Sequence, residues 1–159
     1  MKHAMVRPGP RYQALLQLLQ TSERVWNGSR LFFARWDLGP SQFNLLNLLY
    51  GEAQGRTQIE LSRLLITHRS NVTGLIDRLE ARGLLERQPS PGDRRAYRVM
   101  LTAAGEKLMR EILPEYYRAA EIVWGSVSAV RAEKMAADLA ELGANIESLE
   151  AKLAEGRVE

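Results

Sequence analysis

Residues 57–83 read TQIELSRLLITHRSNVTGLIDRLEARG, and this stretch decides the fold. Its first four residues form a capping box, because the Thr57 and Glu60 side chains can each satisfy a free backbone amide at a helix start. The box predicts a short helix that runs to about residue 65. Three leucines of this helix are expected to face inward: Leu61, Leu64 and Leu65.

A second helix is predicted over about residues 68–82, after a break at residues 66–67. Thr67 is expected to cap this helix and Gly83 to end it. Apolar residues recur at offsets 0, 3, 4 and 7, which marks the core-facing stripe as Val72, Leu75, Ile76 and Leu79. A short helix, a tight break and a second helix with a polar first half are typical of a helix-turn-helix.

The polar face of this second helix is the candidate DNA-reading surface. It carries His68, Arg69, Ser70, Asn71, Thr73 and Arg78. Arg69 and Asn71 can read guanine and adenine edges in a bidentate way. Ser70 and Thr73 suit phosphate or thymine-methyl contacts, and Arg78 suits a phosphate or a carboxylate. We also expect Thr57 to contact a DNA phosphate besides capping its helix. A merely solvated polar face is the alternative.

A β-hairpin is predicted directly after this helix. Residues 84–87 form its first strand, residues 89–93 are rich in turn formers, and residues 97–101 alternate as a half-buried returning strand. A hairpin in this place is a wing. Its tip carries Asp93, Arg94 and Arg95, and Arg98 lies on the solvent side of the returning strand as a further phosphate contact. An acidic residue two positions from an arginine can hold the guanidinium in place for insertion into a minor groove, where negative potential concentrates. A plain charged turn is the alternative.

Charge and composition narrow the class of protein. The chain has 159 residues and a net charge of +3, and residues 56–110 carry 11 basic and 6 acidic groups whereas residues 111–159 carry 5 and 10. The basic segment therefore coincides with the helix-turn-helix and the wing. There is no cysteine and there are two histidines, which excludes a disulfide framework, a thiol switch and a multi-histidine metal centre. We expect neither metal nor cofactor.

Long helices flank this segment. One is predicted over about 11–36; Gly39-Pro40 ends it, and Ser41 is expected to cap the next helix. Another begins after a Thr102 cap, is bent by Pro114 and ends near residue 127. The last helix has apolar residues at steps of 4, 3, 4, 3 and 4, which is a heptad seam: Met135, Leu139, Leu142, Ile146, Leu149 and Leu153. Packing within one chain is the alternative to the dimer that we expect.

These elements define two lobes. Residues 38–102 form the winged helix-turn-helix DNA-binding lobe, and residues 1–37 with 103–159 form a discontinuous helical dimerisation lobe. The fold class is thus mainly α with a small β-hairpin wing, α+β only by its minor strand content. A dimer axis would place two recognition helices about one DNA turn apart, roughly 34–36 Å.

Aromatic residues on the long helices suggest a ligand pocket. Trp26, Phe33, Trp36 and Tyr116 would surround a planar anionic ligand, with Arg30 as its counter-charge. Ordinary core and dimer packing is the alternative. The chain has no nucleophile elbow, phosphate-binding loop or zinc-protease motif, so we do not expect an enzyme. It has no apolar run of about 20 residues and no signal peptide, so we expect a cytoplasmic protein that does not enter membranes.

Two segments resemble the MarR family of bacterial transcriptional regulators. The first is IELSRLL at residues 59–65 with SNVTGLIDRLEARGLLER at residues 70–87, and the second is DRRAYRVMLTAAG at residues 93–105, which is similar to the wing signature of that family. The resemblance implies a homodimer shaped like a triangle, with the terminal helices at the apex and a winged helix-turn-helix at each lower corner. It also implies that Asp93 and Arg95 are the wing pair and that the operator is a near-palindrome in double-stranded DNA. Gly74 departs from the family pattern, in which a larger polar residue is common.

The resemblance also implies a repressor that a small phenolic or other aromatic ligand releases from DNA. The lack of cysteine and the scarcity of histidine disfavour the peroxide-sensing and zinc-sensing branches. The alternatives are an activator, a DNA-binding dimer with no effector, and a small enzyme with an aromatic-lined pocket.

Overall fold

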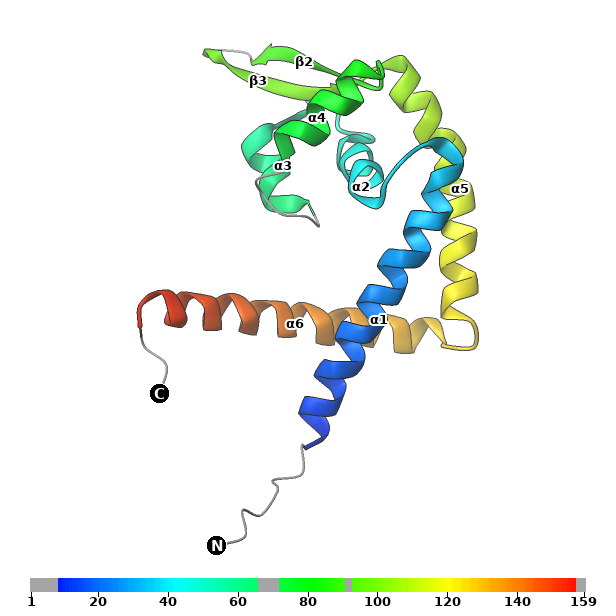
Figure 1. Ribbon diagram of the computed structural model, residues 1–159, viewed down its shortest axis with the longest axis vertical. Helices are drawn as coiled ribbons and strands as arrows, with labels where there is room; N and C mark the ends of the chain where they lie inside the picture. The colour runs from blue at the N-terminus through cyan, green and yellow to red at the C-terminus, as the bar shows by residue number, and fades with distance from the viewer. Residues whose placement is uncertain (1–8, 66–71, 91–92, 157–159) are drawn as a thin grey trace, which may run out of the picture. The chain divides into compact units, whose positions relative to one another are not determined.

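The structure is a computed structural model that describes residues 9–65, 72–90 and 93–156. Its helices are α1 (Pro10–Phe33), α2 (Pro40–Leu49), α3 (Gln58–Leu64), α4 (Val72–Ala81), α5 (Ala103–Trp124) and α6 (Ala129–Ala154), and a short 3-10 helix, η1, covers Ala34–Trp36 (Figure 1). Its strands are β1 (Arg56–Thr57), β2 (Leu85–Ser90) and β3 (Asp93–Leu101). The predicted fold class, mainly helical with a small sheet, is confirmed.

The chain divides into two compact units after Glu111. The first unit contains α1 to α4, the sheet and the start of α5. The second contains the rest of α5 and α6. The division falls inside α5, three residues before Pro114, whose ring removes one backbone donor from the helix. The lobe boundaries at 37/38 and 102/103 stay a prediction.

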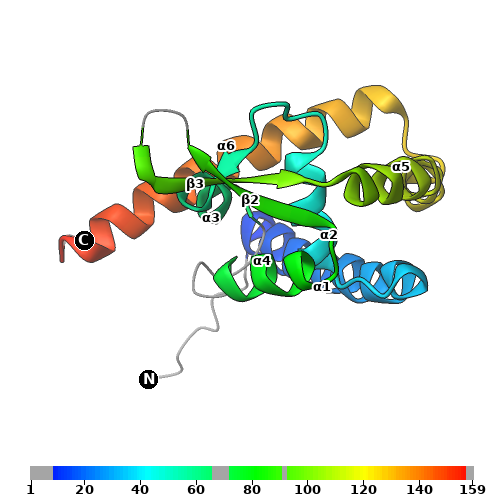
Figure 2. The same cartoon turned by 90° about the horizontal axis from the view of Figure 1, so that it is seen from above.

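The described strands form one antiparallel sheet in the order β1-β3-β2. Leu85 pairs with Leu101 and Pro89 with Tyr97, so the predicted hairpin is present, with a first strand that is longer than expected. Arg56 pairs with Val99, and this two-residue strand β1 was not predicted. The hairpin extends away from the helices α2 to α4 in Figure 1. β2 lies beside α4, and β3 beside α3 (Figure 2).

The core of the first unit lies where α2 packs against the end of α1, the helix-turn-helix and the sheet. The predicted stripe of α4 is buried, with Val72, Leu75, Ile76 and Leu79 each at most 3% exposed. The prediction for Leu64 is wrong, because its side chain is 47% exposed. The helix ends at this residue, and Leu65, whose backbone is already extended, occupies the inward position instead.

The start of α2 differs from the prediction in its cap. Gly39 is the N-cap residue, and its backbone N–H donates to Oε1 of Gln42 at 2.8 Å. Pro40 occupies the first helical turn, where its fixed φ favours the helix and its missing N–H costs nothing. The helix therefore begins before Ser41, which was expected to be the cap.

The start of α5 is attached to the turn that joins α4 to β2. Thr102 is the predicted cap: its Oγ1 accepts from the N–H of Gly105 at 3.1 Å and donates to the carbonyl of Gly83 at 2.6 Å. Its backbone N–H donates to the carbonyl of Leu84 at 3.2 Å. Gly105 is buried, and an ideal Cβ at this position would overlap the Leu84 carbonyl oxygen. Only glycine allows the helix to begin this close to the strand.

Candidate nucleic-acid interface

The capping box fixes the start of α3. The N–H of Thr57 donates to Oε2 of Glu60 at 2.6 Å, and the N–H of Glu60 donates to Oγ1 of Thr57 at 3.2 Å. These bonds confirm the predicted box. Hydrogen bonds from the Thr57 backbone and hydroxyl hold the pKa of Glu60 below its ordinary value, and the guanidinium groups of Arg98 and Arg56 add to this effect. The phosphate contact of Thr57 stays a prediction.

A side-chain hydrogen bond joins the two helices of the helix-turn-helix. Nε2 of Gln58 on α3 donates to Oγ1 of Thr73 on α4 at 2.6 Å. Thr73 is exposed, on the polar side of α4. A hydroxyl that accepts one hydrogen bond can still donate another, for example to a phosphate oxygen. His68, Arg69, Ser70 and Asn71 lie outside the described residues.

Arg87 of β2 holds α4 against the wing. Its Nη2 donates to Oδ1 of Asp77 at 2.5 Å, and its Nη1 pairs with Oε2 of Glu80. The Asp77 carboxylate, which is the larger influence, and the Glu80 carboxylate raise the pKa of Arg87. One guanidinium thus spans two carboxylates that lie one helical turn apart, and this fixes how α4 is rotated relative to the sheet. The sequence analysis did not identify this contact.

The wing residues are placed by the strand β3. Asp93, Arg94 and Arg95 occupy its first positions, next to the hairpin tip, and their side chains lie outside the described part of the structure. Nε of Arg98 donates to the carbonyl of Gln54 at 2.6 Å, and its Nη2 donates to the carbonyl of Gly55 at 2.8 Å. Arg98 therefore braces the root of the wing, and its predicted phosphate contact remains a prediction.

A cavity of about 350 Å³ lies between α1, the start of α2 and α4. Its walls contain Trp26 and Arg30 from α1, Gly39 to Gln42, and Leu75 and Arg78 from α4. Two guanidinium groups, one indole ring and the positive end of a helix dipole thus face one space. Arg78 was predicted at the DNA surface, and the structure places it on α4 where that helix also forms the cavity wall.

The other predicted pocket residues lie elsewhere. Phe33 is 2% exposed and stacks on Phe43 with ring centroids 4.1 Å apart, so its ring belongs to the core. Nε1 of Trp36 donates to Oε1 of Glu111 at 2.7 Å. Tyr116 belongs to the second unit. The cavity thus shares Trp26 and Arg30 with the predicted set.

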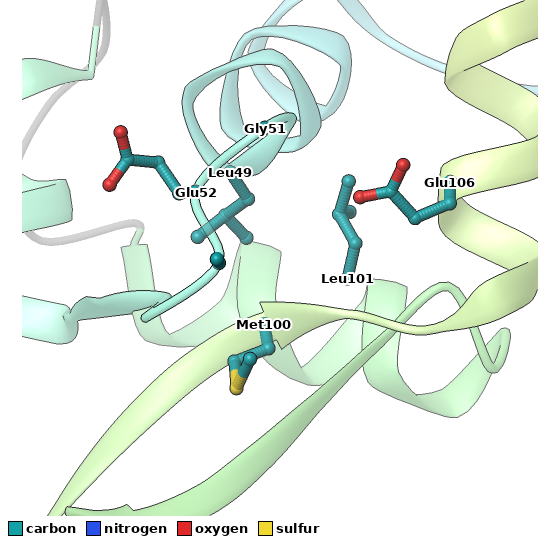
Figure 3. Close-up of a pocket in the computed structure, with 7 residues that line it drawn as sticks. Leu49, Gly51, Glu52, Met100, Leu101 and Glu106 are labelled. Carbon is teal, nitrogen blue, oxygen red and sulfur yellow. The ribbon is translucent and has the colours of Figure 1, made fainter.

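A smaller cavity of about 220 Å³ lies where the turn after α2 meets the end of β3 and the start of α5. Glu52 and Glu106 lie on opposite sides of Leu49 and Leu101 in Figure 3. Each carboxylate has its own arginine, Arg56 at 3.1 Å and Arg110 at 3.5 Å. The acidic groups are thereby neutralised within the chain.

The heptad seam lies on α6 and is largely open to solvent in the single chain. Leu142 is half-buried, and exposure rises from 42% at Met135 and Leu139 to 46% at Ile146, 49% at Leu149 and 55% at Leu153. Ser128 caps this 26-residue helix by accepting from the N–H of Arg131 at 3.4 Å. An exposed apolar stripe of this length is unusual in a monomer.

The described ranges contain neither a metal-binding cluster nor a helix suited to a membrane. No group of three or more His, Cys, Asp or Glu side chains could hold a metal ion there. No helix in the same ranges is both long and apolar enough to cross a bilayer.

A helix-turn-helix with a hairpin packed against its second helix defines a winged helix-turn-helix, the class of fold found in many DNA-binding regulators. A sequence profile of the MarR family matches residues 36–96, which is the segment that forms this fold. This segment of the chain is therefore similar to the DNA-binding part of the MarR family.

Two curated relatives resemble part of the chain. It is 36% identical over 76 residues to the transcriptional repressor MprA of Escherichia coli K12, covering 48% of this chain and 43% of MprA. It is 34% identical over 73 residues to the transcriptional repressor NicR of Pseudomonas putida, covering 46% of each chain. The match thus spans less than half the length of these relatives. Both are transcriptional regulators and not enzymes, as predicted for this chain.

Solved structures share the fold over a longer stretch. A putative MarR-family regulator from Listeria monocytogenes, in complex with a 26-mer DNA, covers 100% of this chain and 99% of its own, with a TM-score of 0.77 and 19% identity. The transcriptional repressor CouR, bound to a 23-mer DNA duplex, covers 80% and 89%, with a TM-score of 0.71 and 29% identity. Bordetella bronchiseptica BpsR, whose DNA binding is regulated by 6-hydroxynicotinic acid, covers 80% and 98%, with a TM-score of 0.65 and 23% identity.

Proposed function

We propose that this chain is a sequence-specific DNA-binding transcriptional repressor that acts as a homodimer in the cytoplasm. The observation that carries the proposal is the orientation of α4, which Gln58 ties to α3 and Arg87 ties to the wing. In this orientation the exposed polar side of α4 would enter a major groove while the β2–β3 hairpin reaches along the duplex. Residues 38–102 would form the DNA-binding lobe.

Polar residues that precede α4 in the sequence, two on α4 itself and those of the wing would provide the contacts. Arg69 and Asn71 would read base edges, and His68, Ser70, Thr73 and Arg78 would supply the neighbouring polar contacts. Asp93 and Arg94 would support Arg95 in a minor groove, and Thr57 and Arg98 would lie near phosphates.

A second copy of the chain would cover the α6 seam. The seam has the 3.5-residue period of helices that pack side by side, and most of it is exposed in the single chain. A two-fold axis there would make residues 1–37 and 103–159 the dimerisation lobe. It would pair two α4 helices on a near-palindromic operator, with half-sites about 34–36 Å apart.

The larger cavity would bind the effector, a small aromatic or phenolic acid. Trp26 offers a stacking face, and Arg30 and Arg78 offer cations for a carboxylate or phenolate. Because Arg78 and Leu75 belong to α4, a ligand that contacts these side chains would shift the helix that reads DNA. The alternatives are a DNA-binding dimer that takes no effector, and an activator.

Selection of DNA from a pool of random duplexes tests the DNA-binding part of the proposal. We expect enrichment of an inverted repeat whose half-sites lie about one helical turn apart, with affinity that falls steeply as salt rises. A single half-site would contradict the dimer, and no enrichment would contradict sequence-specific binding.

Tryptophan fluorescence tests the effector site. Benzoic acid and 6-hydroxynicotinic acid are suitable probes, and we expect each to quench the protein and to release the selected duplex. Trp26→Phe should remove the quenching, whereas the matched control Trp124→Phe, in the second unit, should keep it. Quenching without release would favour the effector-independent alternative, and quenching that survives in Trp26→Phe would place the ligand elsewhere.

A further inference from the structure

We propose that Arg82 is a positioning residue that fixes the end of α4 to the junction between α1 and α2, and that sequence-specific binding depends on this attachment. The inference rests on the proposed DNA-binding function. Arg82 follows α4 directly. Its Nη1 donates to the carbonyl of Asp37 at 2.5 Å, and its Nη2 donates to the carbonyl of Trp36 at 3.1 Å.

The junction has a shape that suits this guanidinium. It consists of η1 followed by Asp37, whose φ of +53° is the one positive value among the described non-glycine residues. Two successive carbonyls there point toward α4 and accept from one planar fork, a geometry that arginine provides and lysine does not. Oδ2 of Asp37 lies 3.9 Å from Nη2 of Arg82 and adds a weaker attraction.

The same junction is also fastened to α5. Trp36, whose carbonyl accepts from Arg82, uses its indole Nε1–H to donate to Glu111. The guanidinium of Arg35 covers the Trp36 ring at 4.4 Å. Trp36 is therefore held through its backbone, its indole N–H and its ring face, which makes the junction a rigid point shared by α1, α4 and α5 within the first unit.

This attachment adds a third tie on α4. Gln58 joins the beginning of α4 to α3, Arg87 joins its middle to the wing, and Arg82 joins its end to the junction between α1 and α2. Arg82 lies four residues after Arg78, which lines the larger cavity. The Arg82 attachment, called the clamp below, is therefore one helical turn from that cavity, whose walls include α1 and α4. A displacement of α1 against α4 must therefore either move the recognition helix or break the clamp.

Duplex binding by the full-length protein tests this role. Arg82→Met keeps the aliphatic stem and removes the donors, and Arg82→Lys keeps the charge without the fork. The probes are the duplex that the wild-type protein selects from a random pool and a scrambled duplex of the same composition. We expect Arg82→Met to bind the selected duplex about tenfold more weakly, equivalent to about 1.4 kcal/mol, and the scrambled duplex within twofold of wild type.

Hydrogen exchange provides a readout that is independent of DNA. The N–H groups of Asp37 and Leu38 donate to the carbonyls of Ala34 and Phe33, and they should exchange faster in both Arg82 variants. Trp36→Phe, which lacks the indole donor, should weaken binding less in an Arg82→Met background than in wild type, because both changes loosen one junction. Arg110→Met is the control: it removes an exposed arginine of the same unit that pairs with Glu106 four residues before it, and it should change neither readout.

Four outcomes overturn the inference. Wild-type affinity and exchange in Arg82→Met would show that the clamp does not hold α4. An equal loss on both duplexes would make Arg82 a phosphate contact. A wild-type protein that selects no duplex would overturn the proposed function itself, a result that is seen before any variant is made. If Arg82→Met does not fold, Arg82→Lys must lose affinity for the selected duplex and not for the scrambled one. Wild-type affinity of Arg82→Lys for the selected duplex then overturns the inference.

Discussion

Gly105→Ala should destabilise the protein, although alanine is the better helix former. Gly105 lies in the first turn of α5, next to the chain that leads into β2. A Cβ at this position would overlap the carbonyl oxygen of Leu84, and it would lie 3.1 Å from the Leu84 carbonyl carbon and 3.1 Å from Cδ2 of Leu101. Two of these three atoms belong to the backbone, which cannot move aside as a flexible side chain can.

The magnitude follows from what must give way. Forcing a methyl group into a packed site costs about 1–3 kcal/mol. Moving α5 away would also weaken the bonds from Thr102 to the Leu84 and Gly83 carbonyls, each of which contributes about 1 kcal/mol. The higher helix propensity of alanine returns about 1 kcal/mol. The expected net loss is about 3 kcal/mol, a fall in Tm of roughly 6–12 °C for a chain of this size.

Urea unfolding at one fixed protein concentration measures this loss, because the stability of a dimer varies with concentration. Gly28→Ala is the matched control: Gly28 lies inside α1, and nothing stands within 4 Å of an ideal Cβ there. We expect this variant to equal or exceed wild type by up to about 1 kcal/mol. Wild-type stability of Gly105→Ala would refute the close approach of α5 to Leu84.

Four further predictions concern charges and the seam. Arg87→Met should lower the free energy of unfolding by about 1 kcal/mol and weaken operator binding, and unchanged operator affinity would contradict the role of this residue in orienting α4. The pKa of Glu60 lies below its ordinary 4.5 in the folded chain, so the stability that this group contributes is present above pH 4.5 and is lost as the pH falls through the folded pKa. Glu60→Gln should therefore make the free energy of unfolding depend less on pH in that window. The same pH dependence in the variant and in wild type would exclude the effect. Arg95→Ala should reduce the salt slope of DNA binding by about 1, whereas an unaltered slope and affinity would exclude the wing contact. The double variant Leu142→Lys, Leu149→Lys should be a monomer that no longer binds the operator. A dimer mass of this variant in light scattering would contradict the assignment of the seam as the dimer contact.

Features that depend on neighbours along the chain could be predicted from the sequence. The capping box of Thr57 and Glu60, the Thr102 cap and the buried stripe of α4 all follow from spacing of three or four residues. The hairpin was predictable because residues 89–93 contain turn formers between a short predicted strand and the alternating stretch 97–101.

Features that depend on distant partners could not be predicted. The strand β1 has two residues, and it exists because Arg56 and Thr57 meet β3 across some forty positions of sequence. Arg82, Arg87 and Arg98 look alike in the sequence, as surface cations in a basic segment. The fold assigns two of them to backbone carbonyls and one to carboxylates, and no local pattern distinguishes these roles.

The strand order β1-β3-β2 also bears on how the protein stays dispersed at high concentration. The longest strand, β3, is central, and at its root Arg98 and Val99 pair with both neighbouring strands, so their backbone groups are unavailable to another molecule. One edge of the sheet is only two residues long, and the other contains Pro89, which has no N–H to offer. The two outer strands, β1 and β2, are therefore poor templates for strand addition. The hairpin can therefore extend well beyond the helices, as binding DNA would require, without offering other copies of the protein an outer strand that pairs readily into a growing sheet.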